Sequence, residues 1–310
     1  MINYLVKILR NILGINNLTQ ELTEVKMQNA KILINQIKRM KKPTNLSEIE
    51  FKIFSQFGDD GIIQYIINNL NIEKKNKTFI EFGVENYQES NTRFLLMNDN
   101  WDGLIMDGSK KNIEYVKNQP HYWQHKILAL SEFINIKNIN NLIKDNGFSG
   151  EIGLLSIDLD GNDYWIWKEI STIKPIIIIA EYNGIFGNEF PLSIPYDENF
   201  IRSKTHYSNL YWGCSLRALD HIAKKKGYSF FGCNSSGNNA YFIRDDYLSG
   251  NISKISIDAG YVAPKFRESR NKNGKLSFLN EKERLAVIKN LPLTNVVTGE
   301  TSTISEIFKL

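Results

Sequence analysis

Apolar and polar residues form two alternating patterns between Phe51 and Arg244. Short apolar runs rich in β-branched residues predict strands, and windows with apolar residues every three or four positions predict helices between them. Strands that alternate with helices predict a parallel sheet with right-handed crossovers. The predicted strands are Thr78–Phe82, Leu104–Met106, Lys126–Leu130, Gly153–Ile157 and Ile176–Ala180, and the predicted helices are Ser90–Met97, Lys111–Lys117, Ile136–Lys144 and Tyr164–Ile170.

The end of this region departs from the alternation. The segment "CSLRALDHIAKKKGY" predicts a helix that Ser215 caps and Gly227 ends. Two short aromatic strands follow in "YSFFGCNSSGNNAYFIR", and the Asn/Ser/Gly turn between them predicts a hairpin. The fold class expected is therefore α/β, a Rossmann-like, mostly parallel sheet that ends in an antiparallel hairpin.

The first 45 residues predict a helical extension. The stretch "MINYLVKILRNILGI" has the pattern of a basic amphipathic helix, which suits either an anionic membrane face or a protein partner. Next comes a heptad-like seam with one polar position, which fits a short coiled coil or a helix laid on its own domain. We expect a homo-oligomer through these helices. The seam consists of Leu18, Leu22, Val25, Asn29 and Ile32.

Three parts are predicted along the chain: a helical extension over residues 1–45, the α/β domain over 46–250, and an extension or lid over 251–310. The 38 basic and 34 acidic residues give a net charge of only +4, with no basic stripe interleaved with aromatic residues, so we expect no nucleic-acid partner. Cys214 and Cys233 lie in no metal or redox spacing, and no apolar run approaches the length of a membrane span. We expect a cytoplasmic protein, with peripheral membrane contact as an option.

Polar residues stand where the predicted strands end. In open parallel sheets, ligands bind outside the carboxyl ends of the strands, at the switch in strand order. The glycine after the first strand lets a ligand approach the backbone, and the helix that follows aims free N–H groups at the ligand. The strand ends carry Glu81, with Gly83 beyond it, then Asp107, Ser131, Asp158 and Glu181.

The first two of these ends predict a nucleoside site. The spacing after Glu81 is not Gly-x-Gly-x-x-Gly, which argues for a ligand without pyrophosphate. Asp107 is placed to accept hydrogen bonds from ribose hydroxyls, and S-adenosylmethionine fits because its amino group and ribose both need acceptors. Two structural alternatives stay open: Glu81 as a loop-closing or helix-capping carboxylate, and Asp107 as a turn former.

The segment "LLSIDLDGNDYWIW" predicts a second group of acids. Asp158 and Asp160 are two residues apart and point the same way in an extended backbone. With Glu181 and Asn183 from the next strand end, they suit a hard cation such as Mg²⁺, which would acidify a substrate hydroxyl. Alternatively, one carboxylate with a raised pKa is the general base. Asp163 is expected to cap the next helix.

His206 lies in the long insert after the fifth strand, where a substrate loop would be, and is a candidate to touch substrate or metal. Tyr196, Tyr207 and Trp212 in the same insert could stack on a sugar ring or pack the loop.

Several motifs in order resemble the FkbM-type group of S-adenosylmethionine-dependent methyltransferases: "FSQFGDDGIIQYI", "FIEFGVENYQESNTRFLL", "WDGLIMDGS", "LSIDLDGNDYWIW", "IIIAEYN" and "NAYFIR". The likeness spans about residues 54–244. It implies the seven-stranded class I methyltransferase fold and a sugar hydroxyl of a surface-glycan precursor as acceptor. It implies cofactor contacts at Glu81, Gly83, Asn91 and Asp107, with Ser55 and Gln56 near the cofactor entrance.

The chain departs from one branch of that resemblance. Related metal-dependent sugar O-methyltransferases of the macrocin type carry an Asp-Asp pair after strand five, where this chain has Glu181 and Asn183. Two other functions remain as alternatives. One is a glycosyltransferase that uses Asp158 and Asp160 as an Asp-x-Asp motif, and the other is a non-catalytic assembly protein that oligomerises through its N-terminal helices.

Overall fold

The computed structural model describes residues 15–40, 42–265 and 268–310. Its main element is a seven-stranded sheet with the strand order β3-β2-β1-β4-β5-β8-β7. Strands β1 to β5 are parallel, and β8 and β7 close the edge as an antiparallel hairpin, with β8 against β5. The predicted fold class is therefore confirmed. The strands are β1 (Thr78–Phe82), β2 (Asp102–Asp107), β3 (Ile127–Ser131), β4 (Gly150–Ile157), β5 (Ile173–Glu181), β7 (Tyr228–Cys233) and β8 (Asn239–Arg244).

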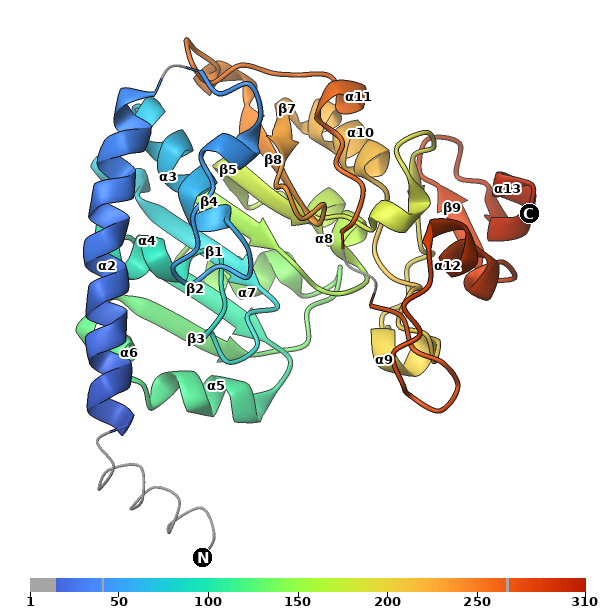
Figure 1. Ribbon diagram of the computed structural model, residues 1–310, viewed down its shortest axis with the longest axis horizontal. Coiled ribbons are helices and arrows are strands. Elements are labelled where there is room, and N and C mark those ends of the chain that lie inside the picture. Colours follow the sequence, from blue (N-terminus) through green and yellow to red (C-terminus); the bar gives the residue numbers. More distant parts are fainter. Residues whose placement is uncertain (1–14, 41, 266–267) are drawn as a thin grey trace, which may run out of the picture.

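Helices cover both faces of this sheet (Figure 1). Successive residues of each strand alternate between two hydrophobic clusters, so that Phe79 lies in one and Ile80 in the other. Helices α2 (Ile15–Arg39), α3 (Asp59–Asn69), α4 (Arg93–Asp99) and α5 (Lys110–Lys117) line the first cluster, with α6 (Pro120–Gln124) beside them. Helices α7 (Ile139–Asp145), α8 (Asp163–Glu169), α10 (Leu216–Lys226) and α11 (Ile257–Gly260) line the second. Burial on both faces explains why the strands are almost continuously apolar.

A third hydrophobic cluster forms a separate small unit, which we call the cap: residues 184–213 and 281–310. The insert after β5 contributes β6 (Leu192–Ser193) and α9 (Arg202–Thr205). The tail contributes α12 (Glu281–Ile288), β9 (Pro292–Asn295), β10 (Thr301–Thr303) and α13 (Ile304–Phe308). Because β6 pairs with β9, two segments about 100 residues apart share one sheet, and they lie side by side in Figure 1.

Helix α2 lies along the outside of the domain (Figure 1). Ala30, Ile34 and Ile37 pack into the first cluster, so α2 is laid on its own domain as one of the two alternatives expected. The heptad-like seam is on the other side of the helix and is exposed. The amphipathic stretch predicted at residues 1–14 lies outside the described residues. No helix in the described ranges has both the length and the apolar character needed to cross a membrane.

Candidate active site

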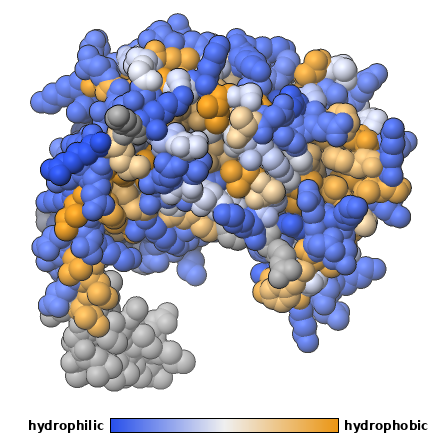
Figure 2. Space-filling model, turned by 45° about the horizontal axis from the view of Figure 1, so that its top comes forward, coloured by the Kyte–Doolittle hydropathy of each residue, from blue (hydrophilic) through white to orange (hydrophobic). Residues whose placement is uncertain are grey.

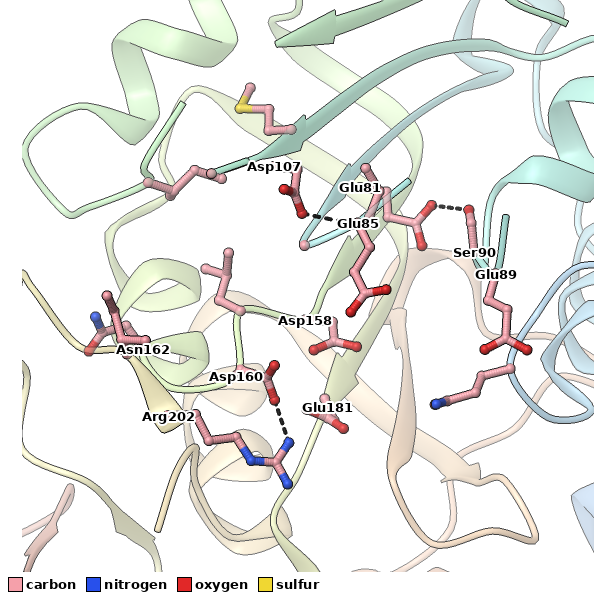
Figure 3. A pocket seen from close by; sticks show the side chains of 18 of the residues that line it. Glu81, Glu85, Glu89, Ser90, Asp107, Asp158, Asp160, Asn162, Glu181 and Arg202 are labelled. Carbon is pink, nitrogen blue, oxygen red and sulfur yellow. Dashed lines mark hydrogen bonds and ion pairs between the residues drawn. The ribbon is translucent and has the colours of Figure 1, made fainter. Parts of the chain in front are cut away.

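A pocket of about 600 Å³ opens at the carboxyl ends of β1, β2, β4 and β5. The strand order reverses between β1 and β4, which is where open parallel sheets bind ligands. Figure 3 shows acids from four neighbouring strand ends around one space. The acidic residues that line it are Glu81, Glu85, Glu89, Asp107, Glu132, Asp158, Asp160, Glu181 and Glu268. Arg202 is the sole lysine or arginine among the described lining residues.

Glu81 ends β1 with its carboxylate buried. Its Oε2 accepts a hydrogen bond from the Ser90 hydroxyl at 2.5 Å, and its Oε1 accepts one from the Asn91 backbone N–H at 2.9 Å. Burial raises the pKa of Glu81, while these hydrogen bonds act in the opposite direction. The loop-closing role left open by the sequence is therefore present, because Glu81 fixes the loop that leads into α4.

Gly83 has a backbone φ of +71°. A side chain here would overlap the backbone carbonyl of Asp158 at the tip of β4. The glycine is thus required by the close approach of two chain segments, whereas the sequence suggested the approach of a ligand. It brings the loops after β1 and β4 together at the pocket.

Asp107 ends β2 and serves the loops on either side of it. Its Oδ2 accepts from the Glu85 backbone N–H at 2.8 Å, and its Oδ1 accepts from the Ser109 N–H at 2.7 Å. It also lines the pocket. The turn-forming alternative therefore coexists with a position suited to ligand contact, since a carboxylate has more lone pairs than these two bonds use.

Asp158, Asp160 and Glu181 form a compact group of acids. One carboxylate oxygen of each lies within 4.8 Å of the others. The Oε2 of Glu181 is buried and has no hydrogen-bond partner among the described residues. A buried oxygen without a donor costs free energy, so its position in a polar pocket marks a place where a donor from a ligand would be stabilising.

The same group has strongly perturbed protonation. Burial raises the pKa of Asp158 well above its usual value, and the charges of Asp160 and Asp163 raise it further. Burial likewise raises the pKa of Glu181, followed by repulsion from Asp158. Like charges this close cannot all ionise at little cost, so the group holds a proton to higher pH than isolated carboxyls do. Carboxyls with such pKa values are suited to general-base chemistry.

Asp163 is the first residue of α8, and it fixes the loop that carries the other acids. Its Oδ1 accepts from the Leu159 backbone N–H at 2.8 Å, and its Oδ2 accepts from the Gly161 N–H at 3.1 Å. Burial raises its pKa to about 6. The N-cap of α8 is Asn162, so the expectation that Asp163 caps this helix is wrong, and its carboxylate holds the preceding loop instead.

Arg202 was not predicted. It begins α9 in the cap, and its Nη1 lies 2.6 Å from Oδ1 of Asp160 (Figure 3). Its Nε donates to the backbone carbonyl of Asn209 at 2.9 Å, and its guanidinium lies 4.6 Å from the ring centre of Trp212. Arg202 thereby connects the cap to the acids of the sheet. It is 42 positions from Asp160, and the segment around it has no periodic pattern that could have revealed the contact.

Two of the residues proposed for metal or substrate do not join the acids. Asn183 is buried, and its side-chain amide donates to the backbone carbonyls of Leu210 and Trp212 while its Oδ1 accepts from the Ile185 N–H. It anchors the insert, so the expected fourth metal ligand is wrong. His206 does not line the pocket. Its Nδ1 lies 2.7 Å from the Ser208 hydroxyl, within the insert.

The remaining predicted cofactor residues divide into two groups. Gln56 and Asn91 line the pocket, and Asn91 also donates to the Ser156 hydroxyl at 3.1 Å. Ser55 is fully buried and donates to Asp60 at 2.9 Å, so it shapes the preceding loop without reaching the pocket. Ser131 at the end of β3 is also absent from the lining, which instead uses the three residues after it.

Comparison with known proteins gives structural likeness alone. No protein-family model matches the chain, and no curated protein matches it. Similar solved structures include S-adenosylmethionine-dependent methyltransferases. The N-terminal domain of EvdMO1 with SAH bound is 8% identical, with a TM-score of 0.40 over 69% of this chain and 94% of that one. A putative caffeoyl-CoA O-methyltransferase from Staphylococcus aureus is 16% identical, with a TM-score of 0.38 over 76% and 99%.

A methyltransferase from Clostridium acetobutylicum described as S-adenosylmethionine-dependent is 11% identical, with a TM-score of 0.37 over 60% of this chain and 90% of that one. Because these identities and TM-scores are low, the activity of this chain has to be argued from its own site residues.

Proposed function

We propose that this chain is an S-adenosylmethionine-dependent O-methyltransferase of the FkbM-like group, which methylates a hydroxyl of a sugar or glycan precursor. The observation that carries the proposal is the single pocket at the switch in strand order, where the acids of β1 and β2 lie beside the acid group of β4 and β5. In this proposal the first pair would contact the nucleoside, and the second group would take a proton.

The lining fits a cationic methyl donor. Nine carboxyl side chains and one guanidinium surround the pocket among the described residues, so its field favours a ligand with positive charge. Asp107 at the tip of β2 would accept from ribose hydroxyls, and the loop that Glu81 fixes would border the amino-acid end of the donor. Gln56 and Asn91 add amide groups at the same rim.

Residues of β4 and β5 would manage the proton of the acceptor. Bound S-adenosylmethionine would supply a methyl group on a sulfonium sulfur, which keeps the C–S bonding pair and leaves as a neutral thioether. The acceptor hydroxyl loses its proton to the Glu181–Asp158 pair as its oxygen forms the new C–O bond. The unpartnered Oε2 of Glu181 is the atom that would receive this proton.

A divalent cation could activate the acceptor hydroxyl in place of the carboxylate base. Oxygen ligands from Asp158, Asp160 and Glu181 within 4.8 Å of one another suit Mg²⁺, which would acidify a bound hydroxyl. The ion pair between Arg202 and Oδ1 of Asp160 already offsets part of the negative charge of the group, which weakens its attraction for a second cation. This contact favours the carboxylate base over the metal.

The acceptor we propose is an uncharged polyhydroxyl group. A phosphate or diphosphate would meet the carboxylates of the lining with a single guanidinium to offset them, so the Asp-x-Asp glycosyltransferase would depend on a divalent cation that competes with the Arg202–Asp160 ion pair. The non-catalytic assembly protein is disfavoured by the raised pKa values of Asp158 and Glu181, which a purely structural domain has no need to maintain.

The test is incubation of the full chain with methyl-labelled S-adenosylmethionine and a panel of glycans and nucleotide sugars, with and without EDTA. We expect label in a sugar hydroxyl, and incorporation that survives the chelator. Loss of all transfer in EDTA, restored by Mg²⁺, would assign activation to the metal. Thermal stabilisation by UDP-sugar with Mn²⁺, and none by S-adenosylhomocysteine, would replace the proposal by the glycosyltransferase.

A further inference from the structure

Helix α2 presents two opposite apolar faces, and only one of them packs on the rest of the described residues. Ala30, Ile34 and Ile37 are buried against the domain. On the other face Leu18, Leu22, Val25 and Ile32 are each more than half exposed, at 56%, 55%, 52% and 58%. Figure 2 shows apolar side chains along the lower part of α2. Four large apolar side chains in one exposed row indicate an interaction surface.

The spacing of the exposed row is that of a two-stranded coiled coil. Leu18, Leu22, Val25, Asn29, Ile32 and Gln36 follow steps of four and three residues, which places them at d, a, d, a, d and a of a heptad repeat. Ala30, Ile34 and Ile37 then occupy b and f positions, on the side that a coiled coil leaves free. The domain therefore lies mainly on the outer side of α2. It reaches the flank of the seam at Leu33, an e position, and leaves Leu18, Leu22, Val25 and Ile32 exposed.

The flanking charges specify what docks there. In a parallel, in-register pair of helices, a g position faces the e position five residues later on the partner. Here g is Glu21 and the matching e is Lys26, and both are exposed. A second copy of the same helix would therefore form the Glu21–Lys26 pair twice, once on each side. The single polar a position, Asn29, would meet its own copy, an arrangement that favours two parallel strands in one register.

We propose that this face binds a second copy of the chain, as a parallel coiled-coil dimer of α2 with one domain on each outer side. The described seam spans fewer than three heptads, which is short for an isolated coiled coil. Here each helix is already ordered by its packing on the domain, so docking does not have to include the cost of helix formation. This inference is independent of the proposed reaction.

The mass of the full chain in solution tests it, by light scattering after size exclusion at tens of micromolar. We expect twice the chain mass for the wild type and a monomer for Val25→Asp. The matched control is Val297→Asp, which changes an equally exposed valine in the cap, at 57%, and should remain dimeric. Unchanged melting temperatures would show that both variants are folded. A monomeric wild type, or a dimeric Val25→Asp, refutes the proposal.

Two further experiments test the charge pairing and the register of the two helices. Glu21→Lys and Lys26→Glu should each weaken the dimer, and an equimolar mixture of the two should form a heterodimer because both pairs become attractive again. Asn29→Cys should cross-link into a covalent dimer under mild oxidation, whereas Glu24→Cys, at an exposed c position, should not. Cross-linking at Glu24→Cys alone contradicts the parallel register.

Lipid is the other occupant to distinguish. If the wild type is monomeric and binds vesicles of phosphatidylserine and phosphatidylcholine, and Val25→Asp abolishes that binding, the seam faces a membrane and the dimer is wrong.

Discussion

The seven-stranded sheet and the cap contribute to the pocket in different ways. The sheet supplies carboxylates from strand tips that are adjacent by virtue of the strand order, so Glu81, Asp107, Asp158 and Glu181 converge as soon as the strands pair. The cap supplies Arg202, whose position depends on pairing between β6 and β9. The sheet thus sets the chemistry of the pocket, and the cap adjusts its charge and closes one side.

The largest effect should come from the sheet. Glu181→Gln removes the proposed proton acceptor while keeping the shape of the side chain, so we expect the proposed methyl transfer to fall by about 10²- to 10⁴-fold. Binding of S-adenosylhomocysteine, measured by calorimetry, should change by less than about threefold. The labelled-methyl assay gives the rate.

Glu132→Gln is the matched control, because Glu132 lines the same pocket from beyond β3 but lies outside the acid group. We expect it to lose less than about tenfold. Equal losses in both variants would mean that the general charge of the pocket matters and that Glu181 has no special role.

The strands of the sheet could be predicted because each has a recognisable local pattern of apolar residues. Each strand was found because its apolar run is continuous, and β1 has the predicted bounds of Thr78–Phe82. The acids followed because a parallel sheet brings its carboxyl ends to one edge. The pattern could not predict the structural roles of these residues. Glu81 and Asp107 also hold loops through hydrogen bonds from backbone N–H groups. Gly83 is required because a side chain there would overlap the backbone at the tip of β4.

The two parts of the cap were expected separately, as a substrate loop after the fifth strand and as an extension or lid at 251–310. The strands of the cap are two to four residues long, too short for a recognisable alternation, and β6 pairs with a segment about 100 residues away. The expectation for Asn183 was wrong because its amide is occupied by backbone carbonyls of the insert, 27 and 29 positions further along the chain.

Weakening the cap core should separate the two regions. Ile304 is fully buried in the cap cluster, and Ile304→Ala should destabilise the cap by about 2–5 kcal/mol through the cavity it leaves. Hydrogen exchange should accelerate in β9 and α13 and stay unchanged in β1 and β4. Acceptor KM should rise while affinity for S-adenosylhomocysteine is kept.

Val297→Ala, at an exposed position of the same unit, should change stability by less than about 0.5 kcal/mol. If Ile304→Ala accelerates exchange throughout the large sheet as well, the cap and the sheet unfold as one cooperative body and the contrast between them is false.

The acid group should also destabilise the fold in a pH-dependent way. The pKa of Asp158 is raised above its unfolded value, so the folded state holds more protons than the unfolded state between the two values. The stability associated with this group is therefore full below the unfolded pKa and is lost as the pH rises through the folded pKa. Asp158→Asn should raise the free energy of unfolding at pH 7–8 by roughly 0.5–2 kcal/mol, with a smaller gain near pH 4.

Urea titrations at the two pH values measure this difference. A destabilised Asp158→Asn at pH 8 would mean that the carboxylate is needed for the local structure, as Asp163 is, and is not a strained functional group.

The smallest effect should come from the contact that joins the two regions. Arg202 is mostly buried, but its partner Asp160 is 57% exposed, so Arg202→Gln should cost no more than about 1 kcal/mol of stability. Its electrostatic effect is more specific. The positive charge of Arg202 lowers the pKa of Glu181, against burial and the neighbouring acids, which raise it. Without Arg202 the proposed general base would hold its proton to higher pH, so the rising limb of the pH–rate profile should move to higher pH.

Arg217→Gln is the control. Arg217 forms a comparable ion pair with Asp258, with 2.8 Å between Nη2 and Oδ1, and neither residue lines the pocket. This variant should leave the pH–rate profile in place. Arg202→Lys should restore most of the shift, because the charge is kept although the fork geometry is lost. If Arg202→Gln lowers the rate equally at every pH, the guanidinium acts by holding the acceptor or the cap and does not tune the acids. In that case the cap takes part in recognition, and the sheet alone sets the protonation of the site.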